Sequence, residues 1–130
     1  MIDRRAVAAG GLQAIAIALP VALVGQWVVD DGDNPGLVLV FLLPVLAGFA
    51  VGGYTAARRA PEGPLANGAV AALVAFAVIQ GFGIARRLAA GAPLSVPSLA
   101  FAAFLAYSCG LLGGAVAQHR RRSPEAGEVR

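Results

Sequence analysis

The sequence has few of the residues from which soluble active sites are built. Its 130 residues include one cysteine, one histidine, one tryptophan and no lysine. Charged residues make up 13% of the chain and hydrophobic residues 58%, whereas soluble domains carry about 25% and about 45–50%. The single Cys109 excludes an internal disulfide and a cysteine-cluster metal site. The composition also excludes intrinsic disorder, which requires high charge and few apolar residues.

Four apolar runs make up most of the chain, and none has Asp, Glu, Lys or Arg in its interior. A bilayer core of about 30 Å takes about 20 apolar residues as a helix, and backbone in lipid must pair its own polar groups. We therefore predict an all-α integral membrane protein, a four-transmembrane-helix bundle in residues 1–122 followed by a short polar cytoplasmic tail, 123–130. The predicted spans are residues 6–29, 36–57, 65–85 and 97–118.

The arginines predict the orientation of these spans, because positive charge concentrates in cytoplasmic segments. With the N terminus inside, eight of the ten arginines lie on the cytoplasmic side and only Arg86 and Arg87 lie outside. The Ala- and Arg-rich, lysine-free composition indicates a bacterium, so we expect a multi-pass inner-membrane protein with both termini cytoplasmic. Arginine runs favour anionic headgroups by about 1 kcal/mol per residue. Membrane lipids are therefore expected partners, and nucleic acid is not.

Two landmarks recur along the chain. The tetrapeptide Ala-Val-Ala-Ala occurs at residues 6–9 and again 63 positions later at residues 69–72. A glycine cluster recurs 61 or 62 positions later, as Gly48, Gly52 and Gly53 and then as Gly110, Gly113 and Gly114. One interpretation is a pair of tandem helical hairpins forming a parallel repeat. The other is coincidence in a chain rich in alanine and glycine.

The glycine clusters predict close helix packing. Gly48 with Gly52, and Gly110 with Gly114, have GxxxG spacing, and Gly53 and Gly113 extend the two faces. Missing side chains on one helix face let two backbones approach, where lipid supplies no hydrophobic drive. The faces could pack within the chain, or they could form a homo-oligomer or bind a membrane protein partner.

Two glutamines lie near the middle of their predicted spans or one to two turns from it. Gln13 and Gln80 are expected to face the bundle and form hydrogen bonds between helices, and a polar substrate path through them is the alternative. No intramembrane residue is ionisable by sequence, and this argues against a proton-coupled transporter.

Charged residues also gather on the predicted outer face. Asp30, Asp31 and Asp33 form an acidic turn, which we interpret as a solvated loop; a divalent cation site is the alternative. Arg86 and Arg87 lie on the same face, against the positive-inside bias. They could pair with the aspartates or hold a lipid phosphate.

One stretch resembles a group of small uncharacterised bacterial four-span proteins. It runs Gly52-Gly53-Tyr54-Thr55-Ala56-Ala57-Arg58-Arg59, and after a short turn Pro64-Leu65-Ala66-Asn67-Gly68-Ala69. Those proteins share a Gly-Gly-aromatic-x-Ala-x-Arg motif, a short cytoplasmic turn and a small-residue start to the third span. The resemblance covers about 20 residues closely. It implies the four-span layout and no activity.

The sequence contains no Ser-His-Asp set, phosphate-binding glycine loop or paired buried carboxylates. We expect no catalytic, cofactor-binding or metal site. The leading expectation is a non-enzymatic membrane protein that acts through helix–helix contacts, as an accessory subunit or scaffold of a membrane complex. The alternative is a small channel or transporter whose pathway forms on oligomerisation.

Overall fold

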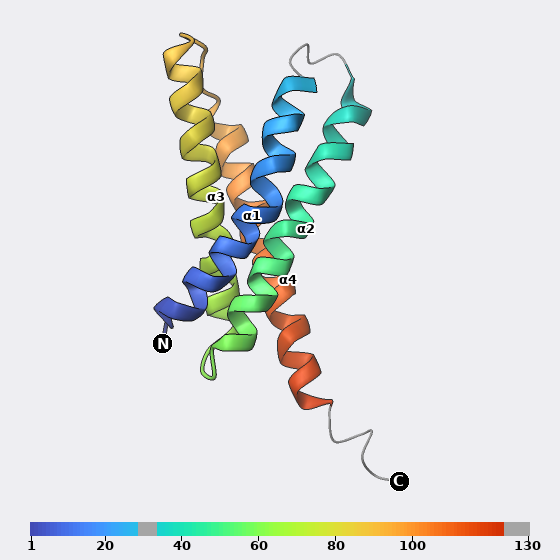
Figure 1. The fold of residues 1–130 in the computed structure, drawn as a ribbon, viewed down its shortest axis with the longest axis vertical. Helices are drawn as coiled ribbons and strands as arrows, with labels where there is room; N and C mark the ends of the chain where they lie inside the picture. Colours follow the sequence, from blue (N-terminus) through green and yellow to red (C-terminus); the bar gives the residue numbers. More distant parts are fainter. Residues whose placement is uncertain (29–33, 124–130) are drawn as a thin grey trace.

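The computed structural model describes residues 1–28 and 34–123, and within those ranges its regular structure is helical (Figure 1). The helices are α1 (Arg4–Val28), α2 (Pro35–Arg59), α3 (Pro64–Ala89) and α4 (Val96–Arg122). All four are long and apolar enough to cross a membrane, because 25 to 27 residues extend about 40 Å. The predicted all-α, four-span fold class is confirmed. Each helix includes arginines that flank its predicted span. Arg4 and Arg5 lie in the first turn of α1, and arginines form part of the last turn of α2, α3 and α4.

Local sequence signals explain where the helices begin. Proline occupies the first turn of α2, α3 and α4, where its missing N–H is not needed. The carboxylate of Asp3 accepts hydrogen bonds from the backbone N–H groups of Arg5 (2.9 Å) and Ala6 (3.3 Å), which caps α1. Asn34 caps α2 by accepting from the N–H of Gly36 at 3.1 Å.

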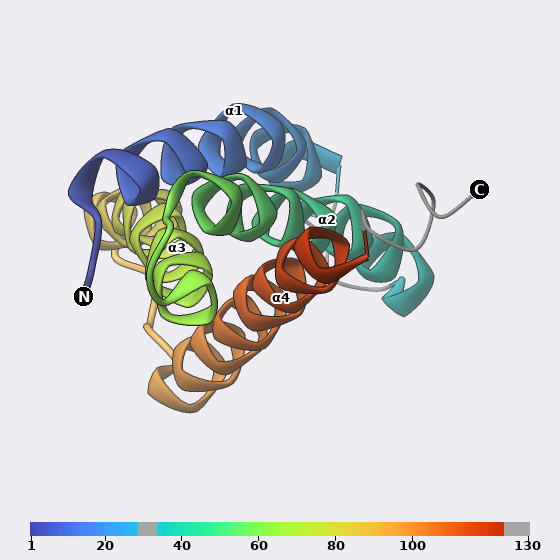
Figure 2. The same ribbon diagram turned by 90° about the horizontal axis from the view of Figure 1, so that it is seen from below.

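The helices form two antiparallel hairpins, α1–α2 and α3–α4, packed side by side (Figure 2). Helices α2 and α3 contact each other in the middle, and within the described ranges α1 and α4 lie apart on either side of them. We call the end where α1 leads to α2 and α3 leads to α4 the hairpin end. The opposite end, with Met1, the α2–α3 turn and Ser123, is the terminal end (Figure 1).

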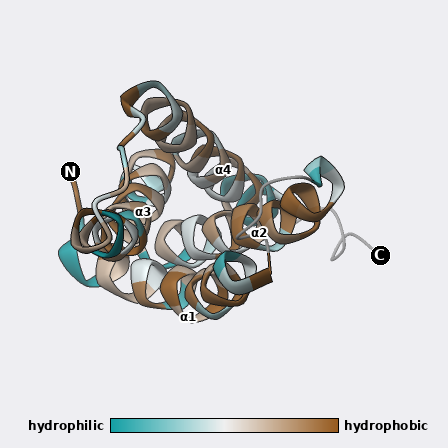
Figure 3. Cartoon of the chain, turned by 90° about the horizontal axis from the view of Figure 1, so that it is seen from above, coloured by the Kyte–Doolittle hydropathy of each residue, from teal (hydrophilic) through white to brown (hydrophobic). Residues whose placement is uncertain are grey.

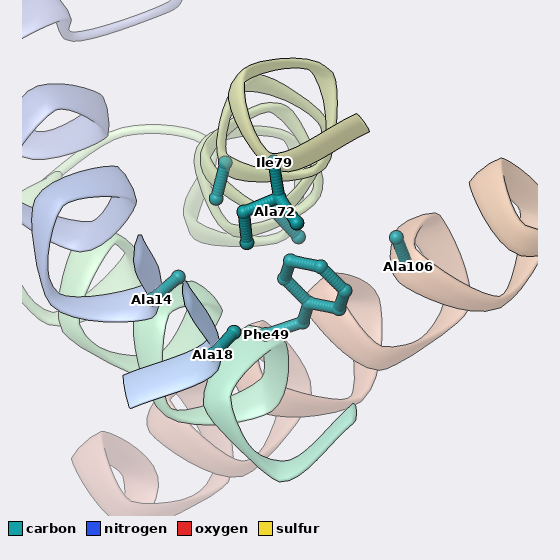
Figure 4. Close-up of a cluster of buried hydrophobic side chains, with 7 residues drawn as sticks. Ala14, Ala18, Phe49, Ala72, Ile79 and Ala106 are labelled. Carbon is teal, nitrogen blue, oxygen red and sulfur yellow. The ribbon is translucent and has the colours of Figure 1, made fainter. Parts of the chain in front are cut away.

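The core at the middle of the bundle is built mainly from alanine. Ala14, Ala18, Ala72, Ala75 and Ala106 are fully buried, and Phe49 and Ile79 fill the space between them (Figure 4). The ring of Phe49 packs edge-on against that of Phe76, with centroids 6.4 Å apart. Small side chains at most inward positions let the helix axes come close, so backbone contacts replace the bulky core of a soluble bundle.

The two hairpins have the same packing of small residues, and equivalent residues lie 58 positions apart in the sequence. A Cβ atom on Gly52 would meet Ala14 and Gly10 of α1, and one on Gly110 would meet Ala72 and Gly68 of α3. Gly10 and Gly68, Ala14 and Ala72, and Gly52 and Gly110 are therefore equivalent pairs. This displacement differs from the 61 to 63 expected from the sequence landmarks. The landmarks matched residue types, whereas the packing matches the positions at which helices cross.

Candidate functional site: a cavity at the hairpin end

A cavity of about 670 Å³ lies between the two hairpins. We call it the cavity. Its apolar wall includes Phe41, Val45 and Phe49 of α2, Phe76 of α3 and Leu105 of α4. Figure 3, viewed onto the hairpin end, shows α2 between α1 and α4 with α3 beside them, and hydrophobic residues on all of these helices. Glycine and alanine hold the helices together nearer the terminal end, whereas these larger side chains separate them here.

Polar side chains line the hairpin-end part of the cavity. They are Gln26 from α1 and Gln80, Arg86 and Arg87 from α3. The Nη1 group of Arg86 donates a hydrogen bond of 2.8 Å to Oε1 of Gln26. Gly83 lies beside both amides, since a Cβ atom there would be in ordinary van der Waals contact with Nε2 of Gln26 at 3.7 Å and Oε1 of Gln80 at 3.8 Å. One end of an apolar cavity thus carries two amides and two guanidinium groups.

A second, smaller pocket of about 300 Å³ adjoins the cavity, and we call it the polar annex. Gln26, Gln80 and Arg87 line both spaces. The annex adds Ser95 and Ser98 from the start of α4, whose hydroxyl oxygens lie 3.0 Å apart and share a hydrogen bond. The combined space is amphipathic, with an aromatic and aliphatic part toward the middle of the bundle and a hydrogen-bonding part at its end.

The predicted outer-face residues are only partly described. Asp30, Asp31 and Asp33 lie outside the described residues, so their pairing with Arg86 and Arg87 stays a prediction. Arg86 and Arg87 both line the cavity, and the recorded partner of Arg86 is Gln26. The structure therefore joins the arginines to a polar site that the sequence analysis did not assemble.

The two intramembrane glutamines occupy different environments. Gln80 lies at the cavity, as expected for a residue facing the bundle. Gln13 meets the expectation only in part, because it forms a hydrogen bond between helices but its side chain is exposed on the surface of the bundle. Ala14 takes the inward position against Gly52, and the Gln13 amide reaches sideways to accept a hydrogen bond of 2.7 Å from Thr55 of α2.

All six predicted packing glycines lie at helix crossings within the chain. Gly48 and Gly52 face α1, and Gly53 faces Gly110 of α4. The remaining contacts of the α4 glycines are Gly110 with Gly68 and Ala72, Gly113 with Ala50 and Tyr54, and Gly114 with Pro64 and Leu65. The faces that were candidates for intermolecular contact are thus covered by the protein's own helices.

Asn67 was not identified from the sequence, and it is the one fully buried polar side chain among the described residues. Its Oδ1 accepts from the N–H of Asp3 at 2.7 Å. Its Nδ2 lies within hydrogen-bonding distance of the carbonyl oxygens of Met1, Glu62 and Gly63. A lone asparagine among small apolar residues is the signal that could have indicated it.

The arginines at the terminal end have distinct roles. Arg121 of α4 donates hydrogen bonds to the carbonyl oxygens of Ala57, Arg58 and Ala60, so it caps the C-terminal end of α2. The guanidinium groups of Arg58 and Arg120 each lie 5.7 Å from the centre of the Tyr54 ring. The contacts of Arg120 and Arg121 tie α2 to α4 at the end opposite the cavity, whereas Arg58 and Tyr54 both belong to α2.

Comparison with family models, with curated proteins and with solved structures gives no match to this chain. The resemblance to small four-span bacterial proteins therefore stays a prediction, and the site's own geometry carries the functional argument.

Proposed function

We propose that this protein is a non-enzymatic membrane protein that binds one anionic amphiphile, a lipid of the leaflet at the hairpin end. The observation that carries the proposal is the amphipathic cavity, with Phe41, Phe49 and Phe76 along one part and Arg86 and Arg87 at the other. Its volume of about 670 Å³ falls within the range of about 300–1,000 Å³ typical of small-molecule sites.

The arginines, and not the apolar wall, would select the ligand. Lipid chains are as apolar as the wall, so moving a chain from the bilayer into the cavity yields little free energy. The wall therefore accepts a chain without distinguishing one lipid from another. Arg86 and Arg87 are next to each other at the end of α3, where a membrane-spanning helix reaches headgroup depth. A phosphate there would receive charge-assisted hydrogen bonds.

The double substitution Arg86→Gln, Arg87→Gln is expected to weaken binding of an anionic phospholipid about 30-fold. Each arginine near headgroups contributes about 1 kcal/mol, and about 2 kcal/mol corresponds to that ratio. The measurement is the affinity of the first bound lipid, by native mass spectrometry of delipidated protein titrated with phosphatidylglycerol.

A matched control removes the same charge at the terminal end. Arg59→Gln with Arg122→Gln changes two exposed arginines whose side chains form no hydrogen bond with another described residue. This variant should keep the affinity of the first lipid within about twofold. Equal weakening by both double variants would show that total charge, and not the cavity, governs binding, and the proposal would fail.

An accessory-subunit or scaffold role is the second candidate. The observation that favours it is a stripe along one face of α4 that includes Phe101 and Phe104, each 64% exposed. The glycine faces are already filled, so a partner would contact this apolar stripe. That role predicts a protein that copurifies in fixed ratio with another membrane protein. In the lipid titration, it predicts no preference for anionic lipid.

A further inference from the structure

We infer that the polar annex recognises the hydroxyl groups of a phosphodiester lipid headgroup, so that the preferred ligand carries a glycerol- or sugar-type head. This inference rests on the proposed function and names the ligand class within the same site. The anionic part would lie at Arg86 and Arg87, and the hydroxylated part would extend into the annex between α3 and the start of α4.

The lining of the annex suits hydroxyl groups because it offers donors and acceptors together. Ser95 and Ser98 are each able to donate and accept, and their mutual hydrogen bond of 3.0 Å uses only one of the two hydroxyl protons. Gln80 contributes an amide with a carbonyl oxygen and an NH₂ group. A ligand hydroxyl, itself a donor and an acceptor, matches such a set, whereas a bare phosphate ester has only acceptors to offer.

The geometry also separates phosphate binding from hydroxyl recognition within the site. Arg87 lines both the cavity and the annex, whereas the serines line the annex alone. The annex, at about 300 Å³, is smaller than the cavity and is bounded by Leu94 and Leu99 beside the serines. A phosphate at Arg87 would therefore place its alcohol substituent next to Ser95 and Ser98, while its acyl chains follow the Phe41–Phe49 wall.

Two lipids of equal charge provide the test. Phosphatidylglycerol carries two free hydroxyls in its head, and phosphatidylmethanol carries none. We expect the full chain to bind the glycerol lipid about fivefold more tightly in native mass spectrometry titrations, since one or two added hydrogen bonds are worth about that ratio. The double substitution Ser95→Ala, Ser98→Ala should remove this preference without weakening phosphatidylmethanol binding.

Ser108 of α4 and Ser123, which follows the last residue of α4, provide the matched control. Ser108 and Ser123 donate to the carbonyl oxygens of Phe104 and His119, away from the annex, and Ser108→Ala with Ser123→Ala should keep the preference. Equal binding of both lipids, with both weakened by Arg86→Gln, Arg87→Gln, would overturn this inference and leave the proposed function standing. Binding unaffected by the arginine substitutions would overturn both. Tighter binding of zwitterionic phosphatidylethanolamine than of phosphatidylglycerol would overturn both the inference and the proposed function.

Discussion

The Gly113→Ala variant is expected to unfold at a much lower temperature than the wild-type protein. A Cβ atom on Gly113 would overlap the carbonyl oxygen of Ala50 and lie 2.8 Å from the backbone nitrogen of Tyr54. Both obstacles are backbone atoms of α2, so no side chain can rotate away and the helices must separate. Overpacking costs about 1–3 kcal/mol where neighbours can adjust, and we expect about 3 kcal/mol or more here. Thermal unfolding in detergent, followed by circular dichroism, measures the loss.

Gly81→Ala is the matched control for that experiment. Gly81 also lies inside a helix, but a Cβ atom there would meet no heavy atom within 4 Å. Alanine is favoured over glycine in helix interiors by about 0.5–1 kcal/mol, so this variant should be as stable as the wild type or slightly more stable. If the Gly113→Ala and Gly81→Ala variants unfolded at the same temperature, α2 and α4 would not cross as closely as described.

Loss of the Asn67 side chain is expected to have the second largest effect. The Asn67→Ala variant would leave the N–H of Asp3 and the carbonyl oxygens of Met1, Glu62 and Gly63 without this partner. Nδ2 has two protons for three acceptors, so at most two full hydrogen bonds, or one full bond and one shared between two acceptors, are lost there. The carbonyl oxygen of Gly63 keeps the backbone N–H of residue 67 as a donor. Leaving buried polar groups unsatisfied costs about 1–3 kcal/mol each, and water at the terminal end recovers part of it. We expect about 3 kcal/mol of destabilisation.

Hydrogen exchange locates this effect as well as measuring it. Exchange should accelerate first at residues 1–3 and in the α2–α3 turn, because Asn67 joins these two segments. Asn34→Ala is the control, since Asn34 is exposed and makes a single cap bond of 3.1 Å to Gly36. Its loss should cost about 1 kcal/mol and affect only the start of α2. Equal stability of the two variants would contradict the assigned role of Asn67.

Hydrophobicity and glycine spacing made the fold predictable. Four charge-free runs of about 20 residues or more define four helices, and lipid leaves the backbone no alternative within them. The faces of Gly48–Gly52 and Gly110–Gly114 were also recognisable, because GxxxG spacing places both glycines on one side of a helix. The helix that each glycine face contacts could not be predicted, since α1 and α3 both offer small residues at the same spacing.

The cavity was not predictable, because it depends on how far two hairpins diverge. Gln26 and Arg86 are 60 positions apart and belong to different hairpins, and no local pattern links them. In the sequence, Ser95 and Ser98 are ordinary residues for a helix start. Only the position of α4 shows that they line the same pocket as Arg87. The partners of Asn67 and Arg121 were not predictable for a different reason, because they are backbone atoms, which no residue type marks.

The most direct test of the central claim is lipid contact at the cavity wall, measured by tryptophan quenching. The only native tryptophan is first removed by Trp27→Phe. Phe41→Trp then reports from the cavity, and Phe104→Trp reports from the exposed face of α4. Both positions lie about two turns from the start of their helices. Each protein is reconstituted in phosphatidylcholine containing a few per cent of phosphatidylglycerol with brominated chains. Our account predicts strong quenching that saturates near one anionic lipid per protein at position 41, and weak quenching proportional to mole fraction at position 104. Equal, non-saturating quenching at the two positions would contradict it.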